Sequence, residues 1–126
     1  MHGKSSRLDE EIAIVRQSLE NDPTNIELAN RYWATIAQGD YRSGRYVIDA
    51  YREVALTSST GAATLARAYR ELFLDSGEAP YAHLFDERLI EALRSYVPQM
   101  AEGDRINVQW VLPTIESKSR ATQTDN

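Results

Sequence analysis

Apolar residues recur at the 3.6-residue period of an α-helix over most of this chain. In the first periodic stretch, for example, the residues on one face are Leu8, Ile12, Val15 and Leu19. The whole pattern predicts about five helices, at residues 7–21, 26–38, 42–57, 62–75 and 82–97. The turn after Gly39 is short, so the helices on either side of it are expected to run antiparallel. The pattern therefore predicts an all-α fold built from antiparallel helical hairpins.

Turn residues mark the ends of these helices. Asp22 ends the first one, because the residue before Pro23 is disfavoured in the α conformation. Thr24 or Asn25 is expected to cap the second helix. The segment 57–61, rich in serine and threonine, is expected to be a loop that offers several caps to the fourth.

The pattern changes after residue 105. Ile106, Val108 and Trp110 alternate with polar residues, as in a half-buried strand. A helix would also bring Ile106 and Trp110 together, so both readings stay open, and we favour a short extended segment over residues 105–112. We expect a single domain at 7–112, with a disordered leader at 1–6 and a disordered polar tail at 113–126.

An extended segment in an otherwise helical chain has no sheet to join. Its backbone N–H and C=O groups need partners, so it would lie in a groove of its own domain or pair with a second copy. We therefore predict self-association, as a homodimer, through Ile106, Val108 and Trp110.

The composition excludes several classes of site. With no cysteine among 126 residues, disulfides, thiolate metal sites and cysteine nucleophiles are absent. The net charge of −5 lacks the basic excess expected of a nucleic-acid binder. No apolar run is long enough to cross a membrane and no apolar leader is present, so a cytoplasmic location is expected.

The charges are unevenly distributed along the chain. Residues 28–70 hold six arginines and three carboxylates, whereas both flanks are acidic. Arg67 and Arg70 are three residues apart and share a helix face. Because the arginine fork suits carboxylate and phosphate groups, an acidic partner is a natural expectation for this region. Solvated arginines with no partner would give the same pattern.

Candidate catalytic groups are sparse. His83, Asp86 and Glu87 have helical spacing suitable for one metal ion, but acids at a helix start are also favoured by the helix dipole, and we prefer that reading. Neighbouring carboxylates such as Glu10 and Glu11 point apart on a helix. We expect no metal, no cofactor and no enzymatic activity.

Several segments resemble the tetratricopeptide repeat, a helical hairpin of about 34 residues that stacks into a right-handed array. The motifs that carry the resemblance are Asp22-Pro23-Thr24-Asn25, Gln38-Gly39-Asp40-Tyr41 and Leu65-Ala66-Arg67-Ala68-Tyr69. The resemblance covers roughly residues 10–97. It departs from the family pattern at Tyr51, where alanine is usual, and in the missing Asp-Pro after the third helix.

The resemblance implies a small, non-enzymatic adaptor that binds a protein or peptide. In such arrays the first helix of each pair lines a concave face. The residues implied at this face are Asn30, Arg31, Ala34, Arg67, Arg70 and Glu71. The lysine and asparagine pairs of the carboxylate-clamp subtype are not present at matching positions.

Two other functions remain open. One is a structural or regulatory helical protein whose main partner is its own copy. The other is a DNA-binding regulator, because Leu65-Ala66-Arg67-Ala68 is similar to a helix found in short helical antitoxins. The acids at Asp75, Glu78, Asp86 and Glu87 oppose that reading, since they would repel phosphates.

Overall fold

The computed structural model describes residues 3–38, 44–76 and 82–124. This part of the chain is all-α, as the periodicity predicted. Its elements in order are α1 (Gly3–Asn21), α2 (Ile26–Ala37), α3 (Gly44–Thr57), α4 (Ser59–Ser76), η1 (Ala82–Leu84), α5 (Glu87–Tyr96), η2 (Val97–Gln99) and α6 (Glu102–Thr124).

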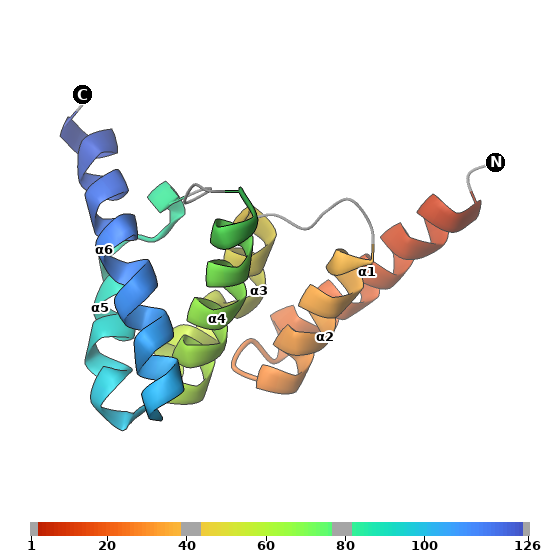
Figure 1. Ribbon diagram of the computed structural model, residues 1–126. Helices are drawn as coiled ribbons and strands as arrows, with labels where there is room; N and C mark the ends of the chain where they lie inside the picture. The colour runs from red at the N-terminus through yellow and green to blue at the C-terminus, as the bar shows by residue number, and fades with distance from the viewer. Residues whose placement is uncertain (1–2, 39–43, 77–81, 125–126) are drawn as a thin grey trace.

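The helices form two layers of antiparallel neighbours (Figure 1). In the view of Figure 1, α2, α4 and α6 lie in front of α1, α3 and α5. The α3 helix packs against α4 and α5, and α4 packs against α6. The α1–α2 hairpin joins this group on the other side, where α2 contacts α3. This places α3 between the hairpin and the rest of the fold.

Side-chain caps fix the helix starts. The Asn25 side chain accepts hydrogen bonds from the N–H groups of Glu27 and Leu28 at 3.0 and 3.3 Å, so it starts α2. The Ser58 hydroxyl accepts from the Gly61 N–H at 3.0 Å and starts α4. Each bond satisfies one of the N–H groups that a helix start leaves without a partner. The expected loop at 57–61 is thus reduced to a sharp corner between two helices.

The core runs along α3 and α4 and continues between α5 and α6. Ile12, Val15 and Leu19 bring α1 into it, as their spacing predicted. At the centre the Tyr69 and Phe85 rings meet edge to face, with centroids 4.9 Å apart. The fully buried large side chains are Tyr32, Tyr69, Phe85, Ile36, Leu65, Leu89, Leu93, Ile115, Val47, Val54, Val108 and Val111.

One glycine permits the closest helix contact. A Cβ atom added to Gly61 would lie 2.1 Å from the carbonyl oxygen of Val54 in α3. The missing side chain therefore lets the start of α4 cross the end of α3 at backbone distance.

The extended segment predicted at 105–112 is wrong, because these residues belong to helix α6. Val108, Val111 and Ile115 have helical spacing and are buried against the other helices. The alternation that suggested a strand arose because exposed Ile106 and Trp110 also fit a two-residue period. No strand exists among the described residues to pair with one here, whereas a helix satisfies its own backbone.

The structure also differs from the expected leader and tail. Helix α1 begins at Gly3, within the leader, and α6 continues to Thr124, within the polar tail. Pro113 lies inside α6 and is exposed, and the helix continues past it to Thr124. The expected fifth helix starts later than its pattern suggested, because η1 and the Asp86 cap precede α5. The predicted turn at 39–41 lies outside the described residues.

Candidate interaction site

The residues predicted to bind a partner lie on α2 and α4. Five of the six are exposed, namely Asn30, Arg31, Ala34, Arg67 and Glu71. Tyr51 joins α3 to α2, because its hydroxyl donates to the Asn30 side-chain oxygen at 2.7 Å. Burial raises the pKa of Tyr51 to about 12, and the charges of Arg67 and Glu71 act on it in opposite directions. Asn30 therefore contacts Tyr51, and the charges of Arg67 and Glu71 lie close enough to act on it.

Arg70 differs from the other five because it is half-buried between α4 and α6. Its guanidinium lies 4.8 Å from the centre of the Trp110 ring and donates to the Asn107 side-chain oxygen at 2.7 Å. Its Nε atom is buried and has no acceptor among the described residues. The prediction that Arg70 is exposed for partner binding is therefore wrong. Its charge instead joins two helices.

The three residues predicted for self-association all lie on α6, but they do not face the same way. Val108 is buried, so its predicted role at an interface is wrong. Ile106 and Trp110 remain 45% and 51% exposed on one face, four residues apart. Because Trp110 stacks on Arg70, the structure brings this face next to the predicted partner-binding residues of α4.

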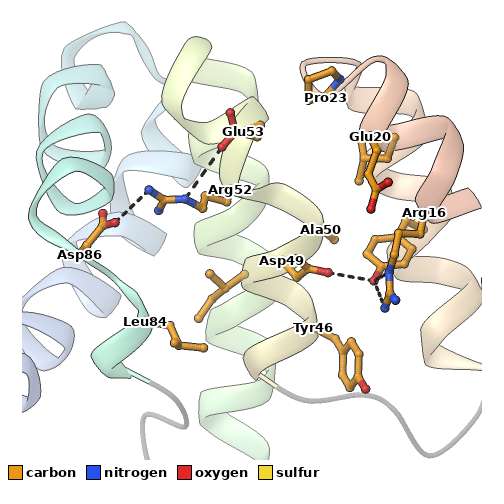
Figure 2. A pocket seen from close by; sticks show the side chains of 13 residues that line it. Arg16, Glu20, Pro23, Tyr46, Asp49, Ala50, Arg52, Glu53, Leu84 and Asp86 are labelled. Carbon is orange, nitrogen blue, oxygen red and sulfur yellow. Dashed lines mark hydrogen bonds and ion pairs between the residues drawn. The ribbon is translucent and has the colours of Figure 1, made fainter.

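A groove of about 850 Å³ crosses the layer that contains α1 and α3 (Figure 2). Helix α3 forms its centre, with α1 on one side and η1 with the start of α5 on the other. Leu19, Pro23, Ile48 and Leu84 supply apolar surface. The charged residues of the lining are Arg16, Glu20, Asp49, Arg52, Glu53 and Asp86.

A hydrogen-bonded chain of three side chains connects α1, α2 and α3 at one end of the groove. Arg16 donates to the Tyr32 hydroxyl from Nε at 3.0 Å and from a terminal nitrogen at 2.8 Å. Tyr32 in turn donates to a carboxylate oxygen of Asp49 at 2.9 Å (Figure 2). Burial raises the pKa of Tyr32 to about 12, and the bond to Tyr32 raises the pKa of Arg16. Tyr32 therefore stays protonated and can donate at neutral pH.

An ion-paired cluster occupies the other end. Arg52 donates to Asp86 at 2.9 Å and lies 3.9 Å from a carboxylate oxygen of Glu53. Asp86 also accepts from the Leu89 N–H at 2.9 Å and so caps α5. Partial burial acts to raise the pKa of Asp86, but these two hydrogen bonds outweigh it and the pKa is lowered. Asp86 thus acts as a helix cap and ion-pair partner.

His83, Asp86 and Glu87, whose spacing in the sequence would suit a metal ion, do not form a metal site in the structure. Asp86 faces Arg52, while His83 is exposed on η1. Among the described residues, no three histidine, aspartate or glutamate side chains are close enough to hold a metal ion. None of the described helices is long and apolar enough to span a membrane.

Sequence reasoning missed the groove. The site residues predicted from the sequence did not include Arg16, Tyr32, Asp49 or Arg52. One signal was present, because the hydroxyl of a tyrosine in a buried stripe needs a polar partner. That signal does not identify the partner, since Arg16 and Asp49 lie 16 and 17 residues away in the sequence.

Comparisons with known proteins add no relative. No family model, no curated protein and no solved structure matches this chain. The resemblance to tetratricopeptide repeats is therefore left as an expectation from the sequence.

Proposed function

We propose that this chain is a non-enzymatic protein-interaction module that binds a segment of a partner protein. The observation that carries the proposal is the groove across α3, whose lining combines apolar residues with charged side chains. Binding sites for protein segments commonly combine these features, because apolar contacts supply affinity and a few polar groups fix orientation.

The groove is a better candidate than the α2–α4 face implied by the resemblance. That face presents mainly polar and charged side chains, and Arg70 is already held by Asn107 and Trp110. Exposed charges of this kind contribute little to binding without apolar contact beside them. The groove offers such contact through Leu84, which is 37% exposed, and through Leu19 and Ile48 at its base.

The experiment selects binders from a displayed library of random peptides on the immobilised full-length chain. The affinity of each selected peptide is then measured for two variants. Leu84→Asp places a charge in the groove. Ile14→Asp replaces another exposed aliphatic residue by aspartate, at a position of α1 outside the groove. We expect Leu84→Asp to weaken binding by about tenfold or more and Ile14→Asp by no more than about twofold.

Other results would count against the proposal. Selected peptides that bind Leu84→Asp as tightly as the parent chain would remove the groove as the site. If those peptides instead lose affinity for Arg67→Glu, the α2–α4 face would be the interaction surface. Failure of the library to yield any binder would contradict the proposal as a whole.

Self-association is the second candidate function. Ile106 and Trp110 form an exposed apolar pair on α6, and aromatic side chains of this kind are enriched at interfaces. If α6 mediates pairing, the parent chain elutes as a dimer in gel filtration and Trp110→Ala shifts it to a monomer. A monomeric parent chain at high concentration would exclude this candidate.

A further inference from the structure

We propose that the segment bound in the groove is a basic amphipathic helix of a partner protein. This inference rests on the proposed function and specifies the chemistry of the partner. It differs from the acidic partner expected from the arginines of residues 28–70.

The charge of the groove selects a basic partner. The described lining holds two arginines and four carboxylates, which gives a net charge of −2. Both arginines are already engaged within the protein, Arg16 by Tyr32 and Arg52 by Asp86 and Glu53. Neither guanidinium is therefore well placed to bind an acidic ligand without giving up an internal contact.

The carboxylates retain capacity for a ligand. Glu20 on the α1 side has neither a hydrogen bond nor an ion pair among the described residues. Glu53 contacts Arg52 only at 3.9 Å and its side chain is 55% exposed. Asp49 accepts from Tyr32 through one oxygen, which leaves the second for another donor. Negative charge is thus available on both α1 and α3.

The apolar residues of the groove lie among these carboxylates. Leu19 precedes Glu20 in α1 and also lines the groove. Pro23 lies on the same side as Glu20, while Leu84 lies on the opposite side (Figure 2). A partner with an apolar stripe could cover them, and flanking lysine or arginine side chains could extend to the carboxylates through their flexible stems. The pattern of the groove therefore matches both parts of a basic amphipathic segment.

The lack of a strand edge among the described residues favours a helical ligand over an extended one. An extended ligand usually pairs its backbone with a strand edge, and the described residues contain no strand. A helix satisfies its own backbone hydrogen bonds and needs only side-chain contacts from the groove. These observations together define the partner as a helix with an apolar face bordered by basic residues.

The test uses two synthetic helical peptides with the same leucine positions. One carries lysine at its polar positions and the other carries glutamate. Fluorescence anisotropy with the full-length chain is expected to give an affinity about tenfold or more higher for the lysine peptide. The double variant Glu20→Gln with Glu53→Gln should reduce that affinity by about five- to tenfold, as expected for the loss of two partly exposed ion pairs.

A matched control separates the groove from general attraction to an acidic protein. Glu10→Gln with Glu11→Gln makes the same change in net charge on the exposed surface of α1, outside the groove lining. We expect this control to change the affinity by no more than about twofold. An equal loss in both double variants would show diffuse attraction and overturn the inference.

Failure of this inference can be told apart from failure of the proposed function. If the glutamate peptide binds as well as the lysine peptide, and Leu84→Asp weakens both, the groove binds protein segments but the inferred charge preference is wrong. If library-selected peptides occupy the groove while the lysine peptide does not bind, the inference is also overturned. If neither library peptides nor synthetic peptides depend on Leu84, the proposed function fails together with the inference.

Discussion

The α3 helix makes two very different junctions with its neighbours in the front layer. Against α4, Gly61 brings the two backbones into direct contact at Val54. Against α2 it is joined by tyrosine side chains, because Tyr32 and Tyr51 form hydrogen bonds between the helices. One junction depends on shape and the other on directed polar contacts.

The groove borders the polar junction. The long tyrosine side chains hold the α1–α2 hairpin at a fixed position beside α3, and Tyr32 itself lines the groove. The lesson is that a directional polar junction can position a hairpin while keeping surface open for a ligand.

The largest effect is expected at the contact between Gly61 and Val54. Gly61→Ala forces a methyl group against the Val54 carbonyl, which cannot move without shifting a helix. We expect the free energy of unfolding to fall by about 3 kcal/mol or more. Thermal and denaturant unfolding measure this change.

Gly103 provides the control for that substitution. A Cβ atom at Gly103 in α6 would meet nothing within 4 Å, so Gly103→Ala should stabilise the chain by about 0.5–1 kcal/mol through helix propensity. Similar melting temperatures for the two variants would contradict the close α3–α4 contact.

The polar junction is expected to fail at alkaline pH. The folded state raises the pKa of both Tyr32 and Tyr51 from 10.0 to about 12. Below pH 10 both states keep these protons, so stability is unaffected; between about pH 10 and 12 the unfolded state loses them first. The free energy of unfolding should then fall by about 1.4 kcal/mol per pH unit for each tyrosine.

Unfolding measured from pH 8 to 12 tests this expectation. The double variant Tyr32→Phe with Tyr51→Phe should show a shallower alkaline loss than the parent chain. An unchanged slope would mean that these two tyrosines do not titrate as their burial indicates.

The smallest effect compares the two tyrosines at neutral pH. Tyr32→Phe removes the acceptor of Arg16 and the donor to Asp49, whereas Tyr51→Phe removes only the bond to Asn30. We expect a loss of about 1–2 kcal/mol for Tyr32→Phe and about 1 kcal/mol or less for Tyr51→Phe. Amide hydrogen exchange should show faster opening of α1 in Tyr32→Phe, and equal exchange in both variants would refute a special role for the Arg16–Tyr32–Asp49 chain.

Much of the local structure could be predicted from the sequence. The stripe of Ile12, Val15 and Leu19 gave the buried face of α1, and Asn25 was among the caps expected for α2. These features depend on neighbouring residues, whose spacing and capping chemistry are visible in the chain itself. The candidate site was less accessible, because its parts come from α1, α2, α3 and η1.

The sequence by itself determined the all-α class, because helical periodicity and caps are short-range properties. Tertiary structure decided the state of residues 105–112, where the pattern fitted both a helix and a strand until Val108 and Val111 found a helical core to enter. It also decided that Arg70 packs on Trp110 and that Arg16 and Asp49 meet at Tyr32. These pairings depend on how helices distant in the sequence pack against one another. The residue spacing within a single helix does not determine that packing.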